Sequence, residues 1–401
     1  MWIPDSAAEI ERIATARELQ ETASFDAKKS LPVAGRNESL AVDVAAMSTD
    51  GGVLLYGVEE DRSGQPVTPT PIPLAGAKER VDQIVQTSIA EAPHIEIREY
   101  PTDADASVGY LLVVIPQSAR APHQVTVGGN LRFYGRGATG NRVLTEGEIA
   151  RLYERRRAWE QDAKELLDRA VQRSRFTATA NQGLLHAVAA PVLPDHAIWD
   201  RACTRAGDRA ELLAVLKAST EEPQIATPDV PQPFRTPIRE WEDLGSDRVR
   251  LSTLARDQDP TNPSMYALDV DVWRDGSAEL TSAGVIWRLP PHAENVILEP
   301  AIAGTVASFL ALVGALYELA GYHGHLDIGV AVEGLQGAVS STEHPGSFPQ
   351  LRYNAADYRR VERFSASELA ARPNVVRRLL GHLFEATTGS TDVEPFTWAP
   401  G

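Results

Sequence analysis

Cysteine is almost absent from this chain. The one cysteine among 401 residues, Cys203, excludes a disulfide framework and a cysteine-ligated zinc cluster. Basic residues are also in deficit, because 39 Lys and Arg stand against 55 Asp and Glu, a net charge of −16. Proteins that coat nucleic acid regardless of its sequence need clustered positive charge. The balance therefore argues against such coating and leaves room for a local basic patch.

The sequence also shows no signal peptide and no clear membrane-spanning segment. The opening Met-Trp-Ile-Pro-Asp has neither the basic nor the apolar part of a secretory signal peptide. One uncharged apolar run, Pro300 to Tyr317, approaches the length that spans a bilayer. It contains two glycines and lies between Glu299 and Glu318, so we expect a buried core helix. We expect a cytoplasmic protein with no membrane partner.

The length of the chain predicts two or three domains, each able to bury its own core. Its 43% apolar and 23% charged residues are ordinary for a globular protein. We predict an α+β fold. Residues 1–157 are expected to form a mixed sheet flanked by helices, residues 158–222 a helical connector, and residues 223–401 a separate α+β domain of unknown role. A proline-rich stretch, Pro223 to Pro237, lies at the start of that last part.

The first 60 residues show the pattern of alternating helices and strands. Ser6 and Glu9 have the spacing of a capping box, which predicts the start of a helix. We expect that helix to reach about Leu19, with a strand at Phe25–Lys28, a second helix from Asn37 to Gly51-Gly52, and a buried strand at Val53–Val58.

The rest of the chain gives a coarser pattern. In the first half we expect a helix at 76–91, paired strands at 95–100 and 108–115, a strand at 131–135 and a long helix from Thr145. In the second half we expect mostly helix at 181–222, a hairpin of 266–273 with 278–287 around Gly276, helices at 301–319 and 365–387, and a strand at 326–332.

Acidic residues cluster at the ends of the early elements. In an extended Phe25–Lys28, Asp26 and Lys28 share one face. On a continuous helix Glu21 and Asp26 would lie about 140° apart, so we place Glu21 at a helix exit and Asp26 on a strand. The run Val53–Val58 delivers Glu59, Glu60 and Asp61 to its carboxyl end. Carboxylates from Glu21, from Asp26 and from this acidic run, together with Lys28, predict a hard-cation site suited to phosphate chemistry. The alternative is a solvated acidic loop with a structural Asp26–Lys28 pair.

These residues resemble a known family. The pattern Glu21-x4-Asp26-x-Lys28, an Asp-Gly-Gly turn, an apolar strand and Gly57-Val58-Glu59-Glu60 is similar to the Schlafen AlbA_2 domain. The segment from Pro122-His123 through Arg132-Phe-Tyr-Gly-Arg136 to Glu148-Ile149 resembles the closing strand and helix of that family. The resemblance covers roughly Ser6 to Arg157.

The resemblance implies a metal-dependent, RNA-cleaving centre in which Glu21, Asp26 and Glu60 hold Mg²⁺ or Mn²⁺. Lys28 then stabilises the charge that develops on the phosphate, or it merely pairs with Asp26. Three positions depart from the family pattern: Asp26 replaces Glu, Ala27 replaces Phe, and Ser48 replaces Asn. The zinc-binding cysteines of the animal proteins are also missing. Bacterial relatives are described as ATP-binding or DNA-binding, and animal relatives build a groove from two lobes, which implies a homodimer here.

Other residues have both a functional and a plain interpretation. Arg132, Tyr134, Arg136 and Arg142 suit contacts with phosphate and stacked bases, or they keep an exposed edge strand soluble. Gly51-Gly52 admits a phosphate to the backbone, or it only ends a helix. His123 is a general acid or an incidental loop residue.

Three hypotheses follow. The first is a nucleic-acid-acting protein, a divalent-metal nuclease that favours RNA, with a sensor, oligomerisation or specificity domain after it. The second is a non-catalytic module that binds nucleic acid or nucleotide and regulates transcription or signalling. The third is a structural protein whose second half recognises another protein.

Overall fold

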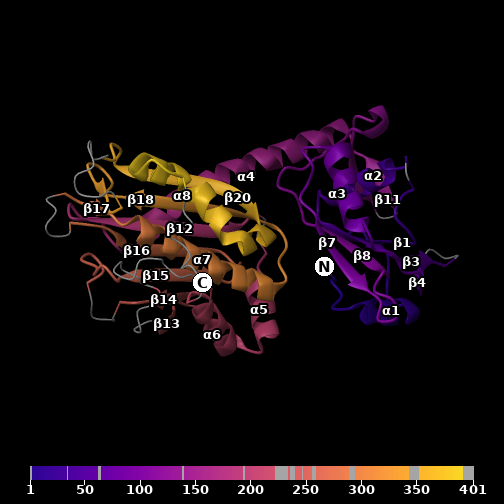
Figure 1. Ribbon diagram of the computed structural model, residues 1–401, viewed down its shortest axis with the longest axis horizontal. Coiled ribbons are helices and arrows are strands. Elements are labelled where there is room, and N and C mark those ends of the chain that lie inside the picture. The colour runs from indigo at the N-terminus through magenta and orange to yellow at the C-terminus, as the bar shows by residue number, and fades with distance from the viewer. Residues whose placement is uncertain are drawn as a thin grey trace. The chain divides into compact units, whose positions relative to one another are not determined.

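The computed structural model describes residues 2–33, 35–61, 65–137, 140–192, 195–221, 234, 240–245, 247–254, 259–288, 294–342 and 352–391, without the side chains of 159–164. The chain divides into two compact units, Met1–Glu160 and Gln161–Gly401, drawn in Figure 1. Both contain helices and sheets, so the predicted α+β class is confirmed.

The first unit is built on a mixed sheet of order β1-β2-β8-β5, in which β7 also pairs with β8. Only β1 and β2 run parallel; the other pairs are antiparallel. A second sheet has the order β11-β10-β9-β6, and β3 pairs with β4. The strands are β1 Phe25–Lys28, β2 Gly52–Tyr56, β3 Val58–Glu60, β4 Pro66–Pro69, β5 Ile72–Pro73, β6 Ile89–Ala90, β7 Glu96–Pro101, β8 Val108–Ile115, β9 Gln124–Val125, β10 Arg132–Gly137 and β11 Gly140–Val143.

Alternation along the strands of the main sheet divides the core of this unit into two layers. Leu54 and Tyr56 pack with α2 (Glu38–Met47) and α3 (Ala77–Ser88), whereas Val53 and Leu55 pack with α1 (Ala7–Thr15). The predicted N-cap of α1 is formed, because Ser6 Oγ accepts a hydrogen bond from Glu9 N, while the Glu9 carboxylate accepts from Asp5 N at 2.7 Å. Each face of the sheet is therefore covered by helix.

The second unit contains a nine-stranded sheet of order β13-β14-β15-β16-β12-β18-β20, with β17 pairing with β16 and β19. Its strands are β12 Gln182–Pro191, β13 Glu240–Asp243, β14 Arg248–Ser252, β15 Leu268–Trp273, β16 Ala278–Trp287, β17 Val296–Ile297, β18 His325–Glu333, β19 Val339–Ser340 and β20 Asp357–Ser365. Its helices are the end of α4 (Glu146–Arg173), α5 Ile198–Ala206, α6 Arg209–Ser219, α7 Glu299–Ala320 and α8 Arg372–Thr388.

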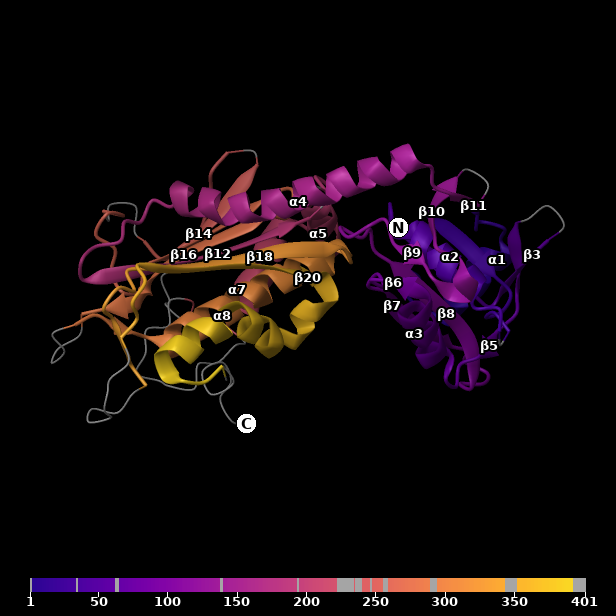
Figure 2. The same cartoon turned by 90° about the horizontal axis from the view of Figure 1, so that it is seen from above.

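The apolar helix α7 is the core of this unit. It packs with α5, α6 and α8 against one face of the sheet, and Leu167 and Ala170 at the end of α4 pack on the opposite face (Figure 2). The helix is long and apolar enough to cross a membrane, but 78% of its most apolar window is buried. The prediction of a buried core helix is confirmed, and the finding is consistent with a soluble protein.

Two predictions about strands were wrong. Residues 158–222 are not a helical connector, because 182–191 form the sheet strand β12 and α5 and α6 join the core of the second unit. A short apolar run that is rich in alanine fits a buried strand as well as a helix, and sheet pairing decides between them. The run Val53–Val58 is interrupted at Gly57, so Glu59 and Glu60 lie in β3 and not in a loop. Most of the proline-rich stretch at 223–237 lies outside the described residues.

Candidate metal centre

Strand β1 carries Asp26 and Lys28 on one side and Phe25 and Ala27 on the other. Ala27 is fully buried and packs, with Phe25, in the core layer beneath α1. Lys28 Nζ lies 3.0 Å from Asp26 Oδ1 and 3.1 Å from Oδ2. The two charged side chains therefore share a face, as the alternation of the segment predicts. Asp26 is only 4% exposed, so its charge is held in a site largely shielded from water.

A tight hairpin brings Glu21 back to Asp26. Thr22 and Phe25 form an isolated antiparallel bridge in which Thr22 N donates to Phe25 O at 3.0 Å. The chain thus reverses immediately after Glu21, and Ala27 N donates to Glu21 Oε1 at 3.3 Å. Helix α1 ends at Thr15, so Glu21 precedes this hairpin and does not lie at a helix exit as expected.

Gly57 positions Glu60. Its φ of +104° suits glycine, and a Cβ at this position would lie 2.8 Å from the Tyr110 ring. The chain therefore breaks from β2 at this residue and continues as β3, which pairs with β4 and ends at Glu60. One carboxylate oxygen from each of Glu21, Asp26 and Glu60 lies within 4.8 Å of the others. Three acidic groups that are far apart in the sequence thus converge.

Arg136 of β10 closes the site from another sheet. Its Nη1 lies 3.3 Å from Asp26 Oδ2, while Nη2 and Nε donate to the carbonyl oxygens of Thr22 and Ala23 at 3.2 and 3.3 Å. It therefore fixes the hairpin that presents Glu21. The side chain of Arg136 is only 9% exposed. Its predicted role as a nucleic-acid contact does not fit this geometry, because the guanidinium group is already bonded within the site.

Asp43 is a member of this cluster that the sequence reasoning missed. It lies on α2, is 6% exposed, and accepts a 2.6 Å hydrogen bond from Asn141 Nδ2. Asn141 Oδ1 in turn accepts from Arg136 Nη1 at 3.1 Å. No local pattern marks Asp43, because it sits in an apolar helix and its partners come from β1 and from the β10–β11 hairpin.

Negative charge exceeds positive charge in this cluster. Four carboxylates, those of Glu21, Asp26, Asp43 and Glu60, face two cations, Lys28 and Arg136, a formal excess of two. Desolvation, the hydrogen bond to Asp26 and the charges of Asp26 and Glu60 together raise the pKa of Glu21 to about 7. Burial works against the charge of Lys28, but Asp43 and Asp26 more than offset it and raise the Lys28 pKa. A divalent cation would neutralise the excess.

The oxygens are close enough for one hard cation. Ca²⁺ lies about 2.3–2.6 Å from its oxygen ligands, so two ligands can be about 5 Å apart across the ion. Mg²⁺ binds at about 2.0–2.1 Å, which limits that separation to about 4.2 Å. The three carboxylate oxygens lie within 4.8 Å of one another, which is close enough for them to share one divalent ion.

The predicted nucleic-acid residues do not form one surface. Arg132, Tyr134 and Arg136 occupy every second position of β10 and therefore share one face of the sheet. Arg142 is the pairing partner of Gly135, so its side chain lies on the opposite face. Arg142 is bonded to Glu148 at 2.6 and 2.9 Å, and the Tyr134 hydroxyl accepts a hydrogen bond from Asn130 Nδ2 at 2.7 Å. Arg132 is exposed and, among the described residues, has no ion-pair partner.

Gly51-Gly52 and His123 have structural roles. Gly51 has a φ of +84° in the turn that follows α2, and a Cβ on Gly52 would lie 2.8 Å from Met47 Sδ. The pair thus ends a helix and permits close packing. His123 is buried, with Nε2 2.7 Å from Ser118 Oγ, and burial lowers its pKa to about 4. The imidazole is therefore neutral at pH 7 and unsuited to act there as a general acid.

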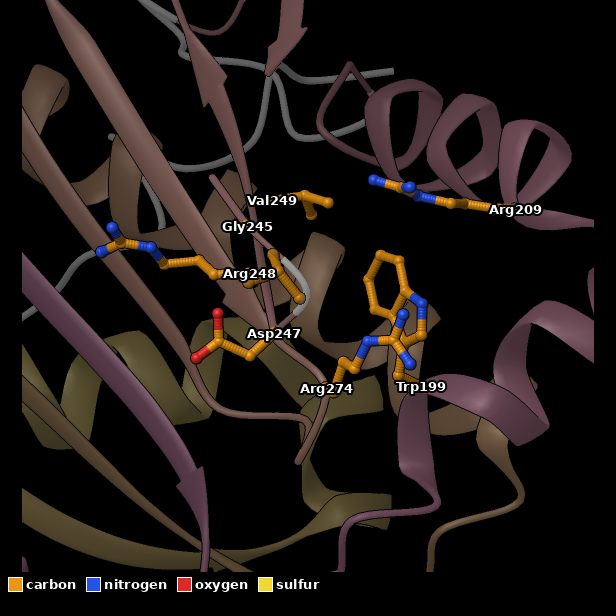
Figure 3. A pocket seen from close by; sticks show the side chains of 8 residues that line it. Trp199, Arg209, Gly245, Asp247, Arg248, Val249 and Arg274 are labelled. Atoms are coloured by element: carbon orange, nitrogen blue, oxygen red, sulfur yellow. The ribbon is translucent and has the colours of Figure 1, made fainter. Parts of the chain in front are cut away.

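The second unit contains a small pocket lined by several arginines. It has a volume of about 20 Å³ and is lined by Trp199, Arg209, Arg248 and Arg274 among others (Figure 3). Arg209 pairs with Asp243, Arg248 with Asp271 at 3.2 Å, and Arg274 approaches Asp200 at 3.8 Å. Figure 3 shows Arg248 and Asp247 extending away from Trp199. These arginines have acidic partners, and the volume is too small for a ligand of ordinary size.

Comparisons with known proteins give little further information. No protein-family model and no curated protein matches the chain. One similar solved structure is an NMR structure, the N-terminal domain of a protein from Nitrosomonas europaea that is named as related to the ATP-dependent DNA helicase RecG. It is 22% identical over 36% of this chain and 96% of its own, with a TM-score of 0.25, which is too low to carry an argument about fold or function.

Proposed function

We propose that the first unit is a divalent-cation-dependent phosphodiesterase that acts on nucleic acid, in the manner of the Schlafen nucleases that its sequence resembles. The observation that carries this proposal is the convergence of Glu21, Asp26 and Glu60 within 4.8 Å, with Lys28 Nζ 3.0 Å from Asp26. Carboxylates that are brought together at an energetic cost, with negative charge in excess, are typical of sites that bind a cation.

Each residue has a defined part in this proposal. Glu21, Asp26 and Glu60 would hold Mg²⁺ or Mn²⁺, which supplies an activated water and offsets charge on the phosphodiester. Lys28 is bonded to Asp26 on the same face, and its ammonium group would stabilise the negative charge that develops on the phosphate. Arg136 would keep the Glu21 hairpin in place through its bonds to the Thr22 and Ala23 carbonyls.

Cleavage of structured RNA with Mn²⁺ tests the proposal. We expect Glu21→Gln and Glu60→Gln to lower the rate at least about 100-fold, since each removes a ligand that offsets charge in the transition state. Glu59→Gln is the matched control, because Glu59 is the neighbour of Glu60 on β3 but pairs with Lys29 at 2.8 Å. Cleavage that survives both test substitutions would reject this site as the catalytic centre.

A second candidate is a non-catalytic module that binds nucleic acid or nucleotide. The observation in its favour is that Asp26 is bonded to two cations, Lys28 and Arg136, and so has partners without a metal. Binding of RNA that neither depends on Mn²⁺ nor leads to cleavage would favour this alternative.

The preference for RNA and the homodimer rest on the resemblance alone. We propose both as extensions of the nuclease assignment. Faster cleavage of RNA than of DNA of the same sequence tests the first. Sedimentation of the full chain tests the second, and a strict monomer would reject it.

A further inference from the structure

A large pocket lies between the end of α1 and the β1 hairpin. Its volume is about 490 Å³, within the range typical of sites for small ligands. Phe25 and Val53 in its lining belong to the core layer beneath α1, so the pocket lies on the face of the sheet opposite Asp26 and Lys28. Gln20 and Thr22, which also line it, flank Glu21 in the sequence, and β1 is an edge strand of the sheet, so a nucleic acid that occupies both sites must pass around this edge.

Two aromatic side chains line the pocket. The rings of Trp2 and Phe25 lie 5.9 Å apart between centroids, with planes at 68°, an edge-to-face arrangement. Trp2 is half-buried and donates from Nε1 to Glu9 at 3.4 Å, which holds the indole in place. Aromatic side chains of this kind stack with unpaired bases, with little dependence on sequence.

The exposed residues that line the pocket carry hydrogen-bonding groups and include no basic side chain. Glu18, Gln20, Thr22 and Ser24 are exposed, and the other lining residues are apolar. Because no lysine or arginine among the described residues lines it, the pocket does not suit a phosphate group. A purely apolar ligand would leave the carboxylate and amide groups of the rim without partners. An aromatic ligand with polar edges fits both parts.

The carboxylate of Glu18 favours a base that donates hydrogen bonds. Guanine presents N1–H beside its N2 amino group, two donors that a carboxylate can accept together. Glu18 is paired with Arg12 at 3.4 Å, but both side chains are more than half exposed. An exposed pair of this kind contributes little stability, so Glu18 can exchange partners.

We infer that this pocket binds an unpaired nucleobase, with guanine preferred, of the same nucleic acid whose phosphate is held at the carboxylate site. The inference rests on the proposed function for the phosphate, but the pocket can be tested alone. Guanosine has no phosphate, and a solution without divalent cations leaves the carboxylates out of the measurement.

Binding of guanosine to the full chain, measured by ligand-observed NMR without divalent cations, is the test. We expect Trp2→Ala to weaken it about tenfold, in line with the loss of one stacked base. Ser24→Tyr, at an exposed position, should fill the pocket and weaken binding to a similar degree. Tyr266→Ala is the control, because Tyr266 is 49% exposed in the second unit. Equal effects of Trp2→Ala and Tyr266→Ala would overturn the inference.

The assignment to guanine has its own comparison. Guanosine should bind about fivefold or more tightly than uridine, and Glu18→Gln should reduce that ratio towards one, since an amide cannot accept two hydrogen bonds side by side. Indole binding as tightly as guanosine would show an aromatic pocket without base recognition and would overturn the assignment.

Continuity with the metal centre is tested with the dinucleoside monophosphate GpG and Ca²⁺. We expect Ca²⁺ to tighten binding of GpG about tenfold and to leave guanosine unaffected, with Glu60→Gln removing the gain. If guanosine binds as expected but Ca²⁺ gives no gain, the pocket stands and its link to the carboxylates is rejected. If RNA is not cleaved but guanosine still binds, the proposed nuclease activity is rejected and the inference about the pocket stands.

Discussion

Two charged clusters, one in each unit, look alike in composition and differ in balance. In the first unit, Glu21 and Glu60 have no ion pair among the described residues, although the site holds Lys28 and Arg136. In the second unit, the charged side chains of β14 to β16 are matched. Asp271 is bonded to Arg250 at 2.6 and 2.8 Å, Asp269 to Arg175 at 2.8 Å, and Glu279 to Arg173.

This difference is the one expected between the proposed cation site and a cluster that only supports the fold. Burying a charge is costly, so charges that only support the fold are paired. The matched cluster meets that condition without any ligand. The cluster in the first unit leaves a formal charge of −2 around the nearly buried Asp26, while Glu21 and Glu60 are exposed; a divalent cation would neutralise this charge. The predictions below test whether balance of charge is what distinguishes the two clusters.

The largest effect is expected for Asp26→Asn. This substitution leaves Lys28 and Arg136 without their carboxylate in a nearly buried site, which should cost about 3 kcal/mol of stability. Hydrogen exchange resolved by peptide would locate the loss in β1 and its hairpin. Asp50→Asn is the control, because the side chain of Asp50 is 77% exposed and should cost less than about 0.5 kcal/mol. Equal losses would mean that Asp26 does not hold the two cations together.

Addition of Mn²⁺ should sharpen the comparison. A ligand that binds the folded state at about 100 times its dissociation constant stabilises it by about 2.7 kcal/mol. We expect slower hydrogen exchange in β1 and β3 and no change in β14 and β15. Glu60→Gln should remove the effect and Glu59→Gln should retain it. Equal protection of both units would show nonspecific binding to an acidic protein.

Asp271→Asn addresses the matched cluster. Arg250 and Arg248 both lose a charged partner, and the side chain of Asp271 is 10% exposed. We expect a loss of about 2 kcal/mol in the second unit, with the affinity for Mn²⁺ unchanged. A change in Mn²⁺ affinity of more than about threefold would indicate that the arginine-rich cluster takes part in cation binding and would break the distinction.

The convergence of Glu21, Asp26 and Glu60 follows from the sequence because each of them lies in or beside a short local pattern. Alternation in Phe25–Lys28 places Asp26 with Lys28, and the acidic residues after Val58 stand out from the apolar run. The helices and strands of the first unit follow for the same reason, since capping residues and apolar periodicity are local. Features that depend on residues close together in the chain can therefore be predicted from the sequence.

The rest of the site depends on contacts between distant segments. Arg136 is 110 residues from Asp26, and Asn141 is 98 residues from Asp43. No spacing in the sequence reports such pairs, so the sequence predicts one nucleic-acid surface from arginines of β10 and β11 that lie on different faces. The misassigned strand β12 has the same origin, because its apolar run fits a helix or a strand until its neighbours β16 and β18 are known.

The smallest expected effect is a dependence of stability on pH that arises from Glu21. Its pKa rises from 4.5 to about 7 in the folded state, because of desolvation and the nearby carboxylates. Between those values the folded protein binds more protons than the unfolded chain, so stability falls as pH rises through this window. Glu21→Gln resembles the protonated form and should remove the fall. Because Glu21 is exposed, solvent screening should limit the gain at pH 8 to less than about 1 kcal/mol.

Thermal unfolding at pH 5 and pH 8, in EDTA and in Mn²⁺, measures this effect. In EDTA we expect Glu21→Gln to match the parent protein at pH 5 and to exceed it at pH 8. With Mn²⁺ the order at pH 8 should reverse, because the cation takes the place of the proton and needs the carboxylate as a ligand. Glu59→Gln should follow the parent protein in all four conditions. A parent protein that is more stable than Glu21→Gln at pH 8 in EDTA would mean that the excess negative charge is already compensated, and the contrast between the two clusters would then disappear.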